Sequence, residues 1–221
     1  MHLRIKALTG VLALGCVWTP LSPGQQQPTR SDQAKSVQMN SVDMAVILAV
    51  IAADYKTTIG LEVDLGKPRS PITLDLRDVN FLQRIDGIVK AEPKYRWREI
   101  DGSIEVFPVN GGSSLLDTPI QSFQVKDVNR VVALNRLLGL PEVQAIASSM
   151  ILKMRPPNAL SERFKDEKLS FDLSGVTLRQ ALNRIAADSG GRFWVFRRYP
   201  DGTFEISLSC SDYYSGKPID D

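Results

Sequence analysis

The sequence predicts an α+β protein with two small modules, in each of which helices pack on a small mixed sheet that ends in a β-hairpin. An internal repeat carries this prediction. Residues 169–185 (LSFDLSGVTLRQALNRI) restate residues 72–88 (ITLDLRDVNFLQRIDGI) at an offset of 97 positions, with alternating apolar residues, an aspartate and then a helical pattern. An Asp-Gly pair follows each copy, at residues 101–102 and 201–202, and indicates a hairpin turn.

The first 24 residues have the pattern of a secretory signal peptide. Arg4 and Lys6 form a basic start, residues 7–18 are apolar but too short to span a bilayer comfortably, and residues 19–24 (TPLSPG) suit a signal peptidase. We therefore expect export, to the periplasm or beyond. Cys16, in LALGC, loosely resembles the acylation site of bacterial lipoproteins, so a lipid anchor is the alternative to a discarded leader.

Export changes which chemistry the chain can perform. Residues 1–24 contain two of the 27 basic residues and none of the 25 acidic ones, so the mature chain is neutral. A neutral chain is a poor nucleic-acid binder, because that binding depends on neutralising phosphates. The single histidine, His2, also leaves with the leader, which excludes His-based catalysis and His-ligated zinc. We expect no cofactor and no bound metal.

The first module is predicted at residues 41–109, after a flexible spacer at residues 25–40. Ser41 is the expected N-cap of a buried helix that Gly60 ends, and residues 61–65 and 72–76 alternate as strands. Asn80 is the expected N-cap of a second helix, which Pro93 ends, and residues 94–109 form the hairpin.

The second module is predicted at residues 119–210, after a linker at residues 110–118. Residues 122–128 read as a strand and residues 130–151 as two helices, followed by an exposed insertion at residues 153–168. The repeated strand then leads to Thr177, the expected N-cap of a helix that Gly190 ends, and to a second hairpin. Residues 211–221 form a C-terminal tail.

These patterns resemble the short N-terminal domain shared by secretins and TonB-dependent receptors. Matching positions in the first copy are Ile72, Leu74, Leu76, Val79, Phe81, Ile85, Tyr95, Asp101 and Gly102. Those in the second are Leu169, Phe171, Leu173, Val176, Leu178, Leu182, Phe193, Asp201 and Gly202. The resemblance implies small periplasmic modules that contact other proteins and carry no catalytic residues. No secretin core or receptor barrel follows the second copy in this sequence, so secretion and uptake are not implied.

Two sets of residues are candidates for a site. The recurrent Asp75 and Asp172 alternate with inward apolar residues, so we expect exposed strand acids, with acid catalysis as the remote alternative. Trp194 and Phe196 are expected to face outwards if Phe193 faces the core, with Arg96 and Arg98 at the nearest equivalent places of the first hairpin. These four residues form the candidate partner interface, although the insertion around residues 150–160 could instead cover the aromatic pair.

Three classes of function remain open. The leading hypothesis is an exported, non-catalytic protein-binding or assembly module of the bacterial cell envelope. Its partner is another envelope protein or a second copy of the chain, and it touches the membrane only through a lipid anchor at Cys16. The alternatives are an exported hydrolase that uses carboxylates alone and a nucleic-acid-binding protein whose exposed aromatic residues and arginines stack on bases.

Overall fold

Two successive copies of one order of strands and helices make up the described part of the chain. The computed structural model describes residues 38–64, 72–75, 79–155 and 168–209, which all belong to one compact unit, residues 34–221. The predictions for the leader at 1–24, for Cys16, for the tail at 211–221 and for most of the insertion lie outside the described residues.

The first copy occupies the described residues up to Pro108. Its elements are β1 (Gln38–Val42), α1 (Met44–Tyr55), β2 (Ile59–Asp64), β3 (Ile72–Asp75), α2 (Phe81–Ala91), β4 (Tyr95–Ile100) and β5 (Ser103–Pro108). The second copy has the same order with one added helix. Its elements are β6 (Pro119–Val128), α3 (Arg130–Leu138), α4 (Pro141–Ser149), β7 (Lys153–Met154), β8 (Leu169–Thr177), α5 (Leu178–Asp188), β9 (Phe193–Arg198) and β10 (Thr203–Ser209).

Strand pairing repeats along with the element order. In the first copy β1 pairs with β3, β2 with β5 and β4 with β5. In the second copy the corresponding pairs are β6 with β8, β7 with β10 and β9 with β10, each in the same relative direction. One further parallel pair, β2 with β9, joins the copies into a six-stranded sheet of order β4-β5-β2-β9-β10-β7.

The repeated helices begin with the same cap. The side chain of Asn80 accepts a hydrogen bond from the backbone N–H of Gln83 at the start of α2, and the Gln83 side chain accepts one from the backbone N–H of Asn80. Thr177 and Gln180 form the same reciprocal pair at the start of α5. Such a capping box satisfies N–H groups that a helix leaves without partners, and the predicted N-caps Asn80 and Thr177 are confirmed.

The predicted N-cap Ser41 is wrong, because Asp43 caps α1 by accepting a hydrogen bond from the backbone N–H of Ala45. Helix α1 also ends at Tyr55, before the predicted stop at Gly60, which lies in β2.

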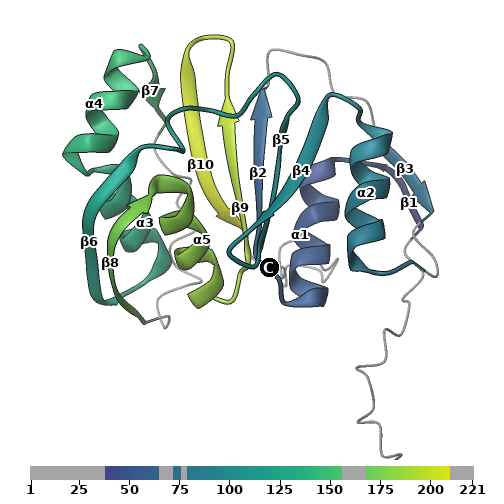
Figure 1. The fold of residues 1–221 in the computed structure, drawn as a ribbon, viewed down its shortest axis with the longest axis horizontal. Helices are drawn as coiled ribbons and strands as arrows, with labels where there is room; N and C mark the ends of the chain where they lie inside the picture. Colours follow the sequence, from purple (N-terminus) through teal and green to yellow (C-terminus); the bar gives the residue numbers. More distant parts are fainter. Residues whose placement is uncertain (1–37, 65–71, 76–78, 156–167, 210–221) are drawn as a thin grey trace, which may run out of the picture. The chain divides into compact units, whose positions relative to one another are not determined.

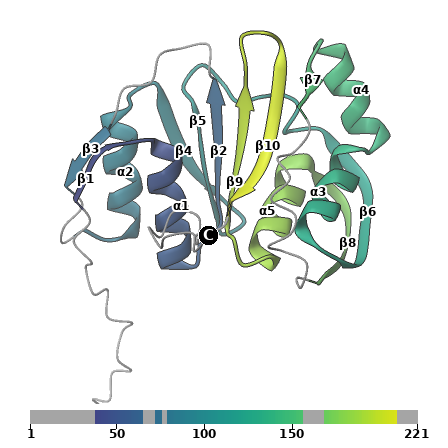
Figure 2. The same ribbon diagram turned by 180° about the vertical axis from the view of Figure 1, so that it is seen from behind.

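The centre of the six-stranded sheet, at β2 and β9, is buried on both faces. Helices α1 and α2 lie on one side of it, and α3 and α5 lie on the other side (Figures 1 and 2). Accordingly the buried apolar residues form two clusters. Strand β9 contributes to both of them, because Phe193 and Val195 face the helices of the first copy while Trp194 and Phe196 face those of the second.

The structure confirms the α+β class and the strand–helix–hairpin order of both copies, but not two separate modules. Each copy has a two-stranded sheet of its own, β1-β3 or β6-β8, but the two hairpins belong to one shared six-stranded sheet. Strand β1 begins inside the predicted spacer at residues 25–40. In the predicted linker, Leu115 and Leu116 are fully buried in the core of the second copy.

Candidate functional site

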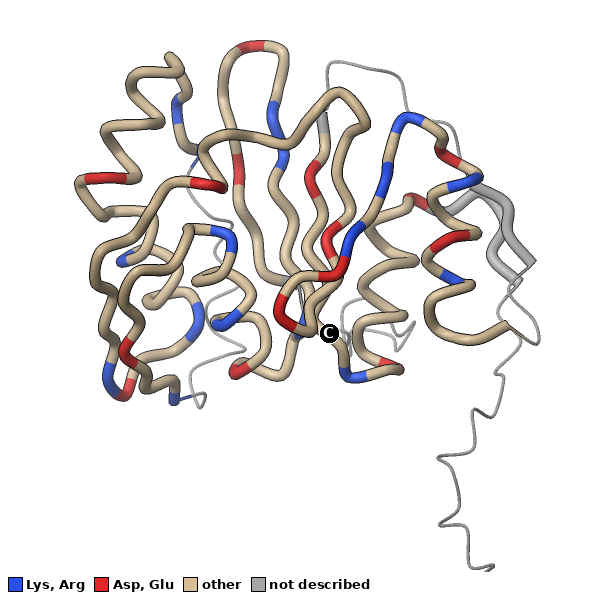
Figure 3. Tube along the Cα trace, in the orientation of Figure 1, with Lys and Arg blue, Asp and Glu red and all other residues tan. Residues whose placement is uncertain are grey.

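Arg96 and Arg98 lie where the sequence predicts, on an exposed strand. Both are exposed and belong to β4, which forms an edge of the six-stranded sheet; blue bands mark basic residues on this strand in Figure 3. Their guanidinium carbons lie 4.9 and 4.8 Å from the centre of the Phe107 ring, a cation–π distance. Arg98 also forms an ion pair with Glu105 at 2.9 Å.

Trp194 and Phe196 do not face outwards, and this part of the predicted interface is wrong. Their exposed fractions are 0% and 2%. The indole N–H of Trp194 donates a hydrogen bond of 2.6 Å to the side-chain oxygen of Asn183 in α5, and the Phe196 ring packs against Phe204. The cluster that buries both rings contains residues of α3 and α5, and Met150 and Leu152 also pack against it. Most of the predicted insertion lies outside the described residues.

A difference of one residue in the hairpin turns explains the error. In the first hairpin Arg98 lies opposite Glu105, and in the second Arg197 lies opposite Glu205. The second turn is therefore one residue longer, and the true equivalents of Trp194 and Phe196 are Tyr95 and Trp97. A shift of one position moves every side chain of a strand to the other face.

The outward-facing apolar pair of the second hairpin is instead Phe193 and Val195. They lie opposite Ile59 and Leu61 across the β2–β9 pair and are buried among the residues of α1 and β2. Phe193 and Val195 thus form an apolar patch on the opposite face of β9 from the predicted one, and the first copy of the same chain covers it.

A buried ionic cluster lies on the other face of this junction. Arg179, near the start of α5, forms an ion pair of 2.6 Å with Glu62 of β2 and lies 3.6 Å from Glu105 and 3.3 Å from Asp117. The second carboxylate oxygen of Glu62 accepts a hydrogen bond of 2.6 Å from the backbone N–H of Ser113. Burial disfavours the charged form of Arg179, but the surrounding carboxylates outweigh burial and raise its pKa. Arg179 therefore stays charged and links the second copy to the sheet of the first.

Sequence reasoning missed this cluster, although one signal points to it. Arg179 occupies the second position of α5, where the helix dipole disfavours a positive charge. A cation at that position indicates a carboxylate partner elsewhere in the fold.

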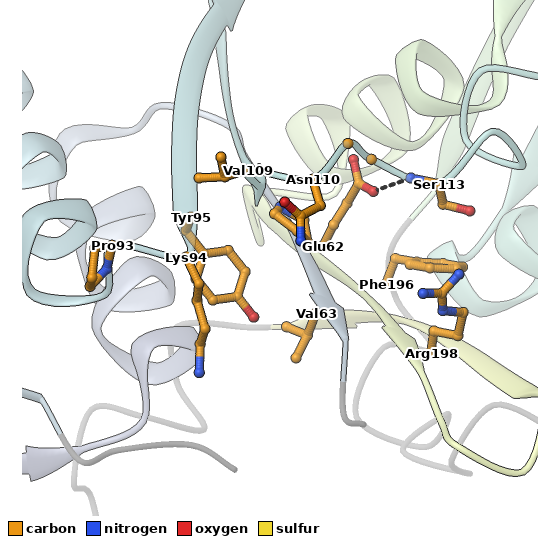
Figure 4. Close-up of a pocket in the computed structure, with 13 residues that line it drawn as sticks. Glu62, Val63, Pro93, Lys94, Tyr95, Val109, Asn110, Ser113, Phe196 and Arg198 are labelled. Atoms are coloured by element: carbon orange, nitrogen blue, oxygen red, sulfur yellow. Dashed lines mark hydrogen bonds between the residues drawn. The ribbon is translucent and has the colours of Figure 1, made fainter. Parts of the chain in front are cut away.

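A pocket of about 460 Å³ opens at the carboxyl ends of β2, β5 and β9, where open sheets with parallel strands often bind ligands. Figure 4 shows Tyr95 and Val63 on one side and Phe196 and Arg198 on the other. Glu62 supplies the carboxylate of its lining, and Arg179 and Ser113 already hold that group. The carboxylate that lines the pocket is thus held by partners of the same chain.

The recurrent aspartates are not brought together as a catalytic pair in what the structure describes. Asp172 is exposed on β8, as expected, and accepts a 3.4 Å hydrogen bond from the side chain of Gln124. Asp75 lies on β3, and its side chain is outside the described residues. Among the described residues, no three His, Cys, Asp or Glu side chains are grouped as metal ligands.

Comparisons with protein-family models, with curated proteins and with solved structures give no match to this chain. None of the helices in the described ranges combines the length and the apolar character that a membrane span requires.

Proposed function

We propose that the chain is an exported, non-catalytic protein-binding or assembly module of the bacterial cell envelope, similar in role to the periplasmic N-terminal domains of secretins and TonB-dependent receptors. The strand–helix–hairpin order on which that resemblance rests is present twice, which supports the proposal. The observation that carries it is the open edge of the sheet at β4.

Strand β4 has a neighbour on one side only among the described strands, namely β5. The backbone N–H of Val109 donates to the carbonyl of Lys94, so the pairs Arg96–Phe107 and Arg98–Glu105 are the hydrogen-bonded ones of this antiparallel ladder. The backbone groups of Trp97 and Glu99 then point away from β5. An edge of this kind is a template for an extended segment of another protein.

The chain already uses strand addition once. Strand β9 of the second copy pairs in parallel with β2 of the first over six residues, from Ile59 with Phe193 to Asp64 with Arg198. A β2 edge left open by the first copy is thus occupied by a strand from the second. The β4 edge has no such occupant among the described strands, and we assign it to the partner.

Site-specific photo-crosslinking in living cells tests the proposal. A photoreactive residue replaces Glu99 on the β4 edge, and a control places the same residue at Arg136, which is exposed on α3. We expect a cross-linked envelope protein, or a second copy of the chain, at position 99 and not at position 136. Identical adducts at both positions, or an adduct with a cytoplasmic protein, would contradict the proposal.

A proline substitution tests the role of the backbone. The N–H of Glu99 points outwards, so Glu99→Pro removes a donor from the open edge without breaking the ladder to β5. Glu99→Ala is the matched control, because it removes the same side chain and keeps the N–H. We expect the crosslink from a photoreactive residue at Trp97 to disappear in Glu99→Pro and to remain in Glu99→Ala.

A further inference from the structure

The β4 edge also indicates which chemistry its partner has. Resting on the proposed function, we infer that β4 binds an extended segment of another protein in which two acidic residues alternate with an apolar one. The acidic side chains lie on the face of Arg96 and Arg98, and the apolar side chain lies on the face of Trp97.

The first argument is the charge on one face of the strand. Arg96 and Arg98 are two residues apart and share a face, and both guanidinium groups are held over the same Phe107 ring. Arg98 has Glu105 as a partner, whereas Arg96 has no carboxylate partner within the described part of the chain. An added strand would place its own side chains beside these two at a spacing of two residues.

The second argument is the apolar character of the other face. The Trp97 side chain is half-buried against the core of the first copy, and its indole N–H donates a 2.7 Å hydrogen bond to Asp86 of α2. This bond fixes the ring beside the open edge, where it can cover an apolar side chain. Glu99 shares that face and is exposed, so it repels an acidic residue placed there. The two faces of β4 therefore select acidic and apolar side chains at alternate positions.

Charged residues on an edge strand can instead serve only to prevent unwanted pairing between sheets. That role requires charge but no particular order of residues in a bound peptide. A pair of peptides of identical composition therefore separates the two roles.

The probe is the peptide Thr-Val-Glu-Val-Glu-Val-Thr with blocked ends and a fluorescent label. Its control, Thr-Val-Val-Glu-Glu-Val-Thr, has the same composition but places its two acids on opposite faces of a strand. Binding to the full chain is measured by fluorescence anisotropy, at low salt and at about 0.5 M salt, where surface charges are screened. We expect the alternating peptide to bind about fivefold more tightly than its control at low salt, the effect of one or two exposed ion pairs, and the difference to shrink at high salt.

Two variants assign the difference to β4. Arg96→Gln should remove most of the preference for the alternating peptide and leave the melting temperature unchanged, because Arg96 is exposed. Arg136→Gln removes the same charge from α3 and should keep the preference.

The outcomes distinguish this inference from the proposed function. Equal binding of the two peptides, with both blocked by Glu99→Pro, would overturn the inference and leave strand addition at β4 in place. Failure of both peptides to bind would also overturn it, and the proposed function would then be judged by the crosslinks alone.

Discussion

The backbone at Ile151 is strained for the residue that occupies it. Ile151 has a φ of 56°, in the left-handed region that branched side chains rarely adopt. It follows α4 in a hydrogen-bonding pattern typical of helix ends, with the N–H of Ile151 bonded to Ser148 and that of Leu152 to Ala147. The side chain is 82% exposed, so burial does not compensate for the strain.

We expect Ile151→Gly to stabilise the protein by about 1 kcal/mol, because glycine adopts this backbone conformation without strain. Urea denaturation measures the change, and Ile151→Ala is the control that keeps a Cβ atom. A loss of stability in the glycine variant would show that the exposed side chain makes a stabilising contact.

Gly60 allows the Trp194 ring of the second copy to lie close to a strand of the first. A Cβ atom at this position would lie 2.2 Å from the Trp194 ring, which belongs to the neighbouring strand β9 and is fully buried. The indole therefore lies over the backbone of β2, and no larger residue fits without moving it.

Gly60→Ala should lower the free energy of unfolding by about 1–3 kcal/mol, as overpacking of a core does. In a Trp194→Phe background, Gly60→Ala should lower the free energy of unfolding by clearly less, because the smaller ring leaves room for the Cβ atom. Thermal denaturation of the parent protein, the two single variants and the double variant measures the coupling free energy between positions 60 and 194. An equal loss of unfolding free energy with Trp or Phe at position 194 would mean that strand β2 shifts to make room and the aromatic ring does not.

At the scale of elements, helix α5 connects the two copies through its first turn and carries an exposed ion pair on its outer side further along. Arg179 is buried among three carboxylates, whereas Arg184 forms an exposed pair with Asp188 of the same helix. The two arginines therefore offer a matched comparison within one element.

Arg179→Ala should destabilise the fold by about 3 kcal/mol or more, since it leaves Glu62 buried without its cation, whereas Glu105 keeps Arg98. Arg184→Ala should cost about 0.5 kcal/mol or less, the effect of an exposed pair. Chemical denaturation at neutral pH measures both. Similar losses of unfolding free energy in the Arg179→Ala and Arg184→Ala variants would contradict the assignment of Arg179 as the link between the copies.

The elements also show what the sequence could and could not predict. Apolar spacing and capping residues such as Asn80 and Thr177 predict the helices, the hairpins and their order, because these depend on nearby residues. The face of the sheet on which each β9 side chain lies depends on the length of the turn in the second hairpin. That turn is one residue longer than the first, so the faces predicted for these side chains were reversed. The pairing of β2 with β9 and the ion pair of Glu62 with Arg179 join distant segments, which local patterns do not specify.

At the scale of the whole molecule, the shared sheet makes the copies depend on each other. Phe193 and Val195 complete the core of the first copy, and Arg179 of the second copy neutralises Glu62 of the first. Separating the copies would expose the β2 edge and leave these groups without their partners. The copies should therefore unfold together.

Hydrogen exchange read by mass spectrometry tests this expectation. Peptides from α1 and from α5 should exchange with the same free energy, equal to that of global unfolding. The two-residue edge strand β7 should exchange faster and serves as an internal control. A much lower value for α1 than for α5 would show that the first copy opens on its own.

The β2–β9 pair also sets the order of events when the chain first acquires its structure. The contact between Glu62 and Arg179 spans 117 residues, so a growing or translocating chain presents β2 long before its neighbour emerges. Contacts between such distant segments slow folding and leave an unpaired strand open to wrong partners in the meantime. Aggregation is thus most favoured in the interval before β9 pairs with β2. A chain truncated before Phe193 should stay bound to a chaperone that a complete chain soon releases.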